Sequence, residues 1–173
     1  MDSIEISKIS IAEVESLKTI SIQTFTETFS EYNTKNDMQK YISTNLSSEK
    51  LLKELNSNES AFYVLNLNTE IIGYLKVNTG MSQTEIQNNT SLEIERIYVK
   101  QAFHGKNFGQ RLLQKAIDIA KKKGCHYIWL AVWEKNLKAI SFYTKHGFMA
   151  FDKHIFQLGD DAQLDIMMKL ELK

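Results

Sequence analysis

The sequence predicts an α+β fold, in which helices cover both faces of a central mixed (α/β) β-sheet of about seven strands. The first reason is the order of elements, because a hairpin of two strands precedes a strand–helix–strand–helix–strand succession. The second reason is that apolar residues recur at helical spacing in the segments between these strands. The 173 residues, 43% of them hydrophobic, can bury one sizeable core, so we expect a single domain over residues 1–173.

Apolar residues that alternate predict strands, and apolar residues three or four positions apart predict helices. The first helix begins at a capping box, in which Ser10 is followed by Glu13 at the third helical position. Strands are expected at residues 4–9, 61–67, 70–77, 92–99, 127–132, 148–156 and 164–172. Helices are expected at residues 10–20, 47–55, 110–123 and 136–146, and the apolar residues within 22–42 form two further helical faces. Residues 78–90 are expected to form a loop.

Residues 92–109, LEIERIYVKQAFHGKNFG, describe a strand that enters a glycine-bearing turn and then the N-terminus of an amphipathic helix. Unpaired backbone N–H groups converge at such a turn and the helix dipole adds partial positive charge, so we expect a phosphate-bearing cofactor. A dinucleotide fold would need G-x-G-x-x-G and a later acidic residue, and a Walker loop would need Lys after its second glycine. Neither pattern is present, because the turn has only Gly105 and Gly109 and Gln110 follows.

The turn HGKNFG resembles the acyl-coenzyme A pyrophosphate loop of the GCN5-related N-acetyltransferase (GNAT) superfamily, which is written [QR]-x-x-G-x-[GA]. The turn departs from that pattern at two positions. His104 stands in place of Gln or Arg, which keeps a ring N–H donor but loses a permanent charge. Asn107 stands in place of the first glycine, and Asn enters the left-handed backbone region at modest cost.

A second signature of that superfamily, N-x-x-A-x-x-[FL]-Y-x-x-x-G-F, is present without a departure. It follows an apolar run at residues 127–132, which predicts a central strand buried on both faces. Two motifs in this order are far more specific than either alone. The resemblance implies a GNAT-like fold and an N-acetyltransferase that uses acetyl-CoA (coenzyme A), with no metal. The matching residues are Asn136, Ala139, Phe142, Tyr143, Gly147 and Phe148.

The strand before the turn changes phase, because Leu92 and Ile94 are apolar at even positions whereas Ile97 and Val99 are apolar at odd ones. One extra residue must be inserted if the same face is to stay buried, so we expect a β-bulge near residues 95–96. Such a bulge would splay the fourth strand from the fifth and open a slot between them. In the family that the chain resembles, the pantetheine arm enters this slot.

The resemblance implies a cofactor site that runs from the slot over the turn to the second motif. Asn136 would bind the pantetheine arm or fix the loop before its helix, and a plain N-cap explains this residue equally well. The bulge would leave a backbone N–H of Ile97 or Tyr98 unpaired, and this group would donate a hydrogen bond to the negatively charged acyl oxygen. The predicted cofactor-binding residues are Ile97, Tyr98, Val99, His104, Gly105, Lys106, Asn107, Phe108, Gly109, Gln110, Asn136, Ala139, Tyr143 and Lys145.

Acetyl transfer requires a neutral amine, although a primary amine has a pKa of about 10.4 by analogy with lysine. Glu93 and Glu95 lie beside the expected bulge, and either could be the base that removes the proton. Either one alone could instead be a solvated charge or a partner of Arg96, and the presence of the pair beside the slot favours a catalytic role. Tyr143 matches the family's general acid, which would protonate the leaving thiolate, and it could otherwise be a half-buried aromatic of the helix.

Four stretches resemble the PaiA-like branch of the superfamily, which is associated with spermidine and spermine acetylation: TFTETFSEYNTKNDM, LEIERIYV, WLAVWEKN with AISFYTKHGF, and GDDAQLDIMMKLEL. A polyamine site needs several carboxylates along an aromatic groove, which match the ammonium groups and offset their desolvation. Each candidate could instead be a surface charge or a core aromatic. Besides Glu93 and Glu95, the residues expected to bind the polyamine are Glu27, Phe29, Glu31, Tyr32, Tyr41 and Trp133.

Two alternatives stay open. The acceptor could be another small amine or a peptide N-terminus, although an amino-acid carboxylate would favour an Arg and only Arg96 lies nearby. The chain could also be a non-catalytic coenzyme A-binding regulator. The departures at His104 and Asn107 argue for that alternative, and the presence of Tyr143 with both glutamates argues against it.

The chain has 21 Lys plus Arg and 21 Asp plus Glu, so no overall field attracts nucleic acid or a membrane surface. No apolar run approaches about 18 residues, which a membrane span would need. The N-terminus MDSIEISKIS is polar and unlike a signal peptide, so we expect a cytoplasmic protein. The expected partner is a small-molecule amine, with a homodimer left open.

Overall fold

The computed structural model describes residues 1–173, which build one seven-stranded sheet in the order β1-β2-β3-β4-β5-β7-β6. Neighbouring strands are antiparallel except β4 and β5, which run parallel. The predicted mixed sheet is therefore confirmed. The strands are β1 (Ile4–Lys8), β2 (Ser60–Leu67), β3 (Glu70–Asn78), β4 (Ser91–Val99), β5 (Tyr127–Trp133), β6 (Met149–Leu158) and β7 (Asp161–Glu171).

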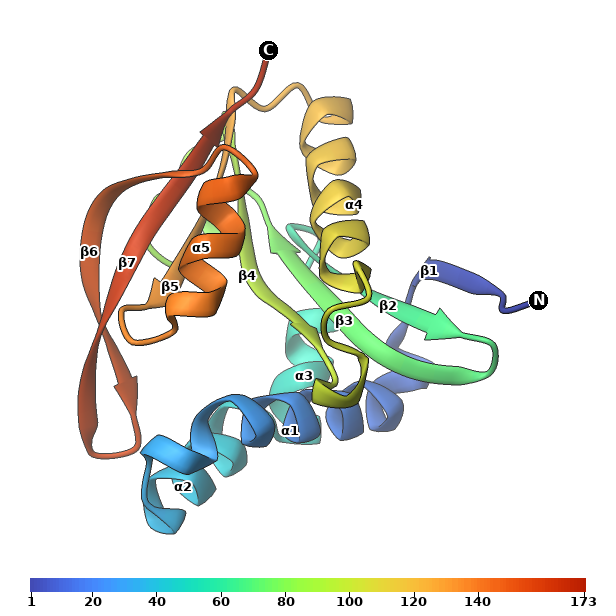
Figure 1. The fold of residues 1–173 in the computed structure, drawn as a ribbon, viewed down its shortest axis with the longest axis vertical. Coiled ribbons are helices and arrows are strands. Elements are labelled where there is room, and N and C mark those ends of the chain that lie inside the picture. The colour runs from blue at the N-terminus through green and yellow to red at the C-terminus, as the bar shows by residue number, and fades with distance from the viewer.

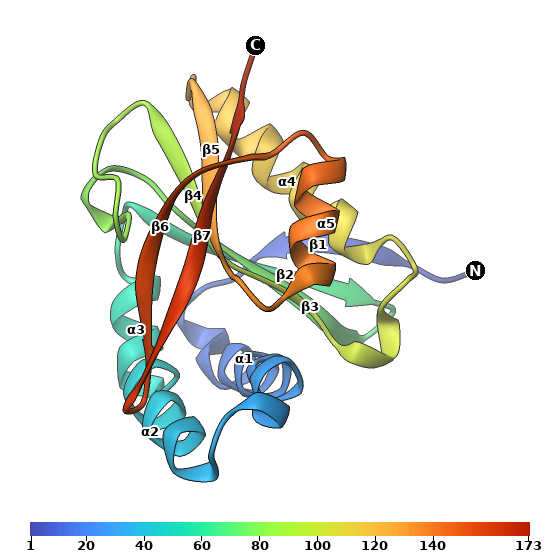
Figure 2. The same cartoon turned by 60° about the vertical axis from the view of Figure 1, so that its left-hand side comes forward.

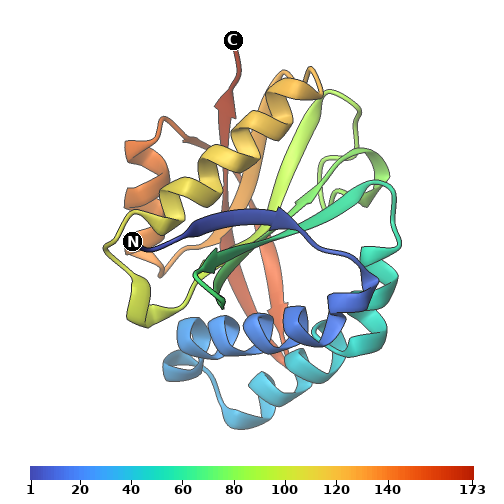
Figure 3. The ribbon, with the colours of Figure 1, turned by 90° about the vertical axis from the view of Figure 1, so that its right-hand side faces the viewer.

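Five α-helices cover the sheet on both faces, with α1, α2 and α3 on one face and α4 and α5 on the other (Figures 1 and 2). Viewed from the edge that carries β1, α4 lies above the sheet and α1 to α3 lie below it (Figure 3). The α4–α5 layer buries one apolar cluster against the strands, and the α1–α3 layer buries two. No helix is long and apolar enough to span a membrane. The helices are α1 (Val14–Phe29), α2 (Lys35–Asn45), α3 (Ser48–Leu55), α4 (Phe108–Lys122) and α5 (Leu137–Lys145).

The first helical region is longer than its sequence pattern predicts. The capping box of Ser10 and Glu13 is present, but it begins a single 3-10 turn, after which α1 continues to residue 29 without a break at residue 20. Thr24 stays inside the helix because its hydroxyl donates to the carbonyl of Ile20 at 2.8 Å. Burial of one face of α1 against the sheet outweighs the weak helix propensity of its Ser and Thr residues.

The bulge expected in β4 is present. Arg96 pairs with Lys76 and Ile94 pairs with Val77, so Glu95 is the extra residue in β4. An extra residue shifts the phase of the strand by one, which explains how apolar residues can change from even to odd positions and still face the same layer.

Beyond the bulge, β4 and β5 separate. Their parallel pairing ends at Ile94 and Leu130, whereas β5 stays paired with β7 as far as Trp133 and Asp165. The far half of β4, from Glu95 onward, consequently has no strand partner on its β5 side. This divergence positions the site described below.

The last two strands, β6 and β7, are longer than predicted and form a hairpin that reaches α2. The backbone N–H of Asp160 at the hairpin tip donates to the Asp37 carboxylate at 2.9 Å, and Lys40 pairs with the Asp160 carboxylate at 2.6 Å. The hairpin therefore closes one side of the space between the sheet and α1 with α2 (Figure 1).

Candidate functional site

A cavity of about 650 Å³ occupies the gap where β4 and β5 separate. Residues of α4 and α5, on one face of the sheet, line it together with residues of α1 and α2, on the other face. The cavity consequently passes through the sheet, so two ligands that enter from opposite faces can meet inside it. This is the geometry that the transfer of a group between two molecules requires.

The turn before α4 presents a row of free backbone donors to this cavity. None of the backbone N–H groups of residues 105–110 donates a hydrogen bond within the protein. Asn107 has a φ of 63°, in the left-handed region as expected for the residue that replaces a glycine, and its side chain caps nothing. A Cβ on Gly109 would meet only the Phe142 ring at 3.8 Å, so the space in front of this turn is open. The turn therefore fits the phosphates of a nucleotide-bearing cofactor.

His104 lies in the cavity lining but already has a local partner. Its Nε2 is 2.7 Å from the carbonyl oxygen of Val99, which can only accept, so Nε2 carries the proton. The Nδ1 atom can then donate to an anion only when the ring is protonated. Lys106 does not line the cavity, and its Nζ lies 5.4 Å from the centre of the Phe103 ring. All the other predicted cofactor residues line the cavity.

Tyr143 is a buried residue of α5 that lines the cavity from the α4–α5 face. Its ring packs against Phe142 and Phe148, and its hydroxyl has no hydrogen-bond partner in the protein. Burial raises the pKa of Tyr143 well above its ordinary value, so the phenol stays protonated and remains a donor. Asn136 also lines the cavity, but its side-chain oxygen caps α5 by accepting from the N–H of Ala139 at 3.2 Å.

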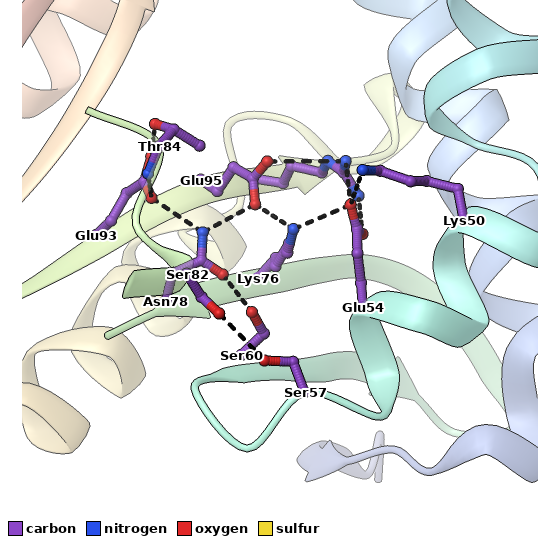
Figure 4. A network of polar contacts seen from close by, with 11 residues as sticks. Lys50, Glu54, Ser57, Ser60, Lys76, Asn78, Ser82, Thr84, Glu93 and Glu95 are labelled. Atoms are coloured by element: carbon purple, nitrogen blue, oxygen red, sulfur yellow. Dashed lines mark hydrogen bonds and ion pairs between the residues drawn. The ribbon is translucent and has the colours of Figure 1, made fainter. Parts of the chain in front are cut away.

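Glu93 is buried beside the cavity rather than in its wall. Only 2% of Glu93 is exposed, and its carboxylate accepts hydrogen bonds from the Asn78 amide and from the backbone N–H of Thr84, each at 2.9 Å (Figure 4). The loop at Thr84 thus covers it. Burial raises the pKa of Glu93 above its ordinary value, although these hydrogen bonds oppose the shift.

Glu95 does line the cavity, and its charge is already neutralised. It forms a close ion pair with Lys76 and accepts from the Asn78 amide at 2.9 Å (Figure 4). Its Oε1 atom lies 3.9 Å from Nη2 of Arg96. Glu54 of α3 extends this network to Lys76 and Arg96. Burial would raise the pKa of Glu95, but the Arg96 and Lys76 charges outweigh it and hold the pKa below its ordinary value.

The predicted substrate residues divide into two groups. Phe29, Tyr41 and Trp133 line the cavity, where they belong to an aromatic cluster with Phe25 and Phe156. Glu27, Glu31 and Tyr32 do not line it. Tyr32 is 62% exposed and only touches Trp133 by its edge, while Glu31 is exposed and Glu27 turns toward Gln101. Their role in binding the amine stays a prediction that the cavity does not support.

Several polar residues of the cavity were not predicted, and three of them lie close together. These three are Glu85 from the loop before β4, His154 from β6 and Asp165 from β7. The loop gave no periodic pattern from which Glu85 could be inferred. For Asp165 a signal existed, because strand alternation places it on the same face as the buried Met167, where an acidic residue is unusual.

Comparisons with known proteins agree with this geometry. The acetyltransferase (GNAT) family model matches residues 15–148. An uncharacterised N-acetyltransferase of Lactobacillus delbrueckii subsp. lactis is 34% identical over 172 residues, which cover 99% of each chain. The spermidine N(1)-acetyltransferase of Thermoplasma acidophilum is 30% identical over 154 residues, 87% of this chain and 91% of that one. The crystal structure of the PaiA N-acetyltransferase of the same organism, in complex with coenzyme A, has a TM-score of 0.80 at 28% identity and covers 98% of this chain and 99% of that chain.

Proposed function

Because the chain belongs to the GNAT family of N-acetyltransferases, which use acetyl-CoA, we propose that its acceptor is a primary amine of a polyamine such as spermidine. The amine would attack directly in a ternary complex. The observation that carries the proposal is the wall of the cavity on the α1–α2 face, which combines aromatic side chains with the carboxylates of Glu85, Glu95 and Asp165. The 30% identical spermidine N(1)-acetyltransferase supports the same acceptor.

Aromatic faces and carboxylates suit this acceptor for separate reasons. The methylene segments of a polyamine bury against aromatic rings such as Phe29, Tyr41 and Trp133, and each ammonium group needs an anionic partner when it leaves water. An amino-acid acceptor would instead need a cation for its carboxylate. Arg96 is committed to Glu54 and Glu95, so it is poorly available for that role.

On the other face, the free N–H groups of residues 105–110 are suited to hold the pyrophosphate of acetyl-CoA, and the unpaired side of β4 is suited to its pantetheine arm. Bound there, the cofactor supplies an acyl group activated as a thioester. A backbone N–H of Ile97 or Tyr98 would stabilise the charge that develops on the acyl oxygen, because both residues line the gap.

Tyr143 would donate its hydroxyl proton in a hydrogen bond to the leaving sulfur. Its unpartnered hydroxyl in the cavity lining and its raised pKa support this role, because a phenol that stays protonated is always available as a donor. Glu95 is the better placed of the two predicted bases, since it lines the cavity. Glu93 would act indirectly, by orienting the Asn78 amide that donates to both carboxylates.

The experiment is an acceptor panel assayed by release of the free thiol of coenzyme A. Spermidine and spermine should be acetylated with a higher kcat/KM than lysine, an aminoglycoside or short peptides. The KM for spermidine should rise with added salt, because ions screen the attraction between the carboxylates and a multiply charged amine. A clear preference for peptides or amino acids would overturn the polyamine proposal and leave the acetyltransferase chemistry intact.

A further inference from the structure

Asp165 is an acidic residue in the cavity wall that the catalytic scheme above does not use. It lies on β7, where its register partners are Trp133 on β5 and His154 on β6. Only 7% of Asp165 is exposed, and it lines the same cavity as Tyr143. A buried carboxylate normally has a hydrogen-bond or ion-pair partner, so the partners of Asp165 decide what it does.

The protein supplies no permanently charged cation to Asp165. No Lys or Arg forms an ion pair with it, and its Oδ1 is fully buried without a hydrogen-bond donor. Its neighbour His154 also has an unpartnered Nδ1, while the Nε2 of His154 lies 3.8 Å from the Glu85 carboxylate. This wall of the cavity, formed by β6, β7 and the loop before β4, therefore carries two carboxylates and a histidine, without a permanent positive charge among them.

Glu95, another carboxylate of the cavity, differs from Asp165 in its partners. Glu95 has Lys76 and Arg96 beside it, so its charge is already balanced within the protein. An ionised carboxylate that is buried without a counter-charge is costly, and a bound cation would remove that cost. Because Trp133 lies beside Asp165 in the sheet register and lines the cavity, the same place offers an aromatic surface to the carbon chain of such a cation.

We propose that Asp165 binds the ammonium group of the polyamine that does not react, with Glu85 and His154 completing this second subsite. The inference rests on the proposed polyamine acceptor and deepens it, because it assigns the residue that distinguishes a polyamine from a simple amine. One amine then lies near Tyr143 and Glu95 for acetylation. The next ammonium along the chain pairs with Asp165 on the β6–β7 wall.

The test compares two acceptors of equal length. One is spermidine, and the other is a monoamine in which ether oxygens replace the remaining nitrogens. In the wild-type enzyme, spermidine should have the lower KM. Asp165→Asn should raise the KM for spermidine about 10- to 100-fold, as expected for the loss of a buried charge-assisted contact, and leave kcat and the KM for acetyl-CoA within about twofold. The KM for the ether amine should not change.

Asp152→Asn is the matched control, since Asp152 is an exposed carboxylate on the neighbouring strand β6 and lies outside the cavity. It should change neither acceptor's KM. If Asp165→Asn lowers kcat with both acceptors, Asp165 acts on the reacting nitrogen and the proposal is wrong. If it leaves the preference for spermidine unchanged, the proposal also fails, while the polyamine function survives. A wild-type enzyme that does not prefer spermidine to the ether amine would overturn the polyamine function itself.

A measurement on the wild-type protein keeps the proposal testable even if Asp165→Asn does not fold. Burial raises the pKa of Asp165 to about 6, so the carboxylate takes up a proton near that pH. The ratio of kcat/KM for spermidine to that for the ether amine should then fall about tenfold between pH 7 and pH 5. The other ionisable groups beside Asp165 are His154, opposite it in the strand register, and Glu85, whose carboxylate lies 3.8 Å from the Nε2 atom of His154. Trp133, its partner on the other side, does not titrate. A ratio independent of pH would contradict the proposal.

Discussion

The carboxylate of Glu27, near the end of α1, accepts a hydrogen bond from the backbone N–H of Gln101 at 2.8 Å. Gln101 begins the short 3-10 turn (Gln101–Phe103) that leads from β4 into the anion-binding turn. Gln23 donates to the other oxygen of the same carboxylate at 3.0 Å, which fixes its direction. This hydrogen bond therefore connects α1, on the acceptor face of the sheet, to the 3-10 turn that leads to the cofactor-binding loop.

This link gives a prediction for Glu27. Glu27→Ala should raise the KM for acetyl-CoA about 2- to 10-fold, because the loss of a charge-assisted hydrogen bond at an exposed site loosens the segment that precedes the turn. It should not alter the preference for spermidine over the ether amine. Glu31→Ala is the control, because Glu31 is also exposed, lies on the next turn of the chain and forms no hydrogen bond or ion pair. A change in spermidine preference with both variants would instead favour a shared role in binding the polyamine.

The case of Glu27 also shows what the sequence could and could not predict. The phase change in β4 required a bulge whatever the tertiary structure, and Asn107 was recognisable as a residue that tolerates positive φ. The direction of Glu27 depended on where α1 ends and which of its faces is buried, and the helix runs nine residues beyond its predicted end at residue 20, to Phe29. Local sequence patterns therefore predicted the residues on the cofactor side of the cavity more accurately than those on the acceptor side.

The acceptor side was harder because its polar residues come from segments distant in sequence. Glu85 lies in an irregular loop, and His154 meets Asp165 only through the pairing of β6 with β7. Glu93 and Glu95 looked equivalent as a pair in the sequence. The bulge and the loop at Thr84 make them different, since one is covered and the other faces the cavity.

Tyr143→Phe tests the proposed donor to the leaving sulfur. We expect kcat to fall about 10²- to 10⁴-fold, the range for a general acid, with little change in the KM for acetyl-CoA, because the hydroxyl acts on charge that appears only in the transition state. The melting temperature should stay the same, since the hydroxyl has no partner within the protein and the ring is retained. Steady-state kinetics and a thermal melt check both points. An unchanged kcat would remove Tyr143 from the mechanism.

Asn107 tests the backbone of the anion-binding turn separately from its side chains. Asn107→Gly should keep acetyl-CoA binding, because glycine adopts a φ of 63° readily. Asn107→Val should destabilise the fold by roughly 1–2 kcal/mol and weaken acetyl-CoA binding, since a β-branched residue resists the left-handed region. Thermal melts with and without acetyl-CoA measure both effects, because a bound ligand raises the melting temperature. Equal binding by the glycine and valine variants would mean that this conformation is not needed.

Asp165 finally predicts how stability depends on pH in the absence of amine. Burial raises its pKa from 3.8 to about 6, an effect that His154 only partly opposes, so between these two values the folded protein binds a proton that the unfolded chain has lost. The stability contributed by this group is complete below 3.8 and is lost as the pH rises through about 6. Asp165→Asn should therefore be more stable than the wild type at pH 7 and lose that advantage as the pH falls toward 4. Denaturant unfolding at pH 4, 5.5 and 7 checks this, with Asp152→Asn expected to follow the wild type. If spermidine stabilises the wild type at pH 7 but not Asp165→Asn, the missing counter-charge is the one that the polyamine supplies.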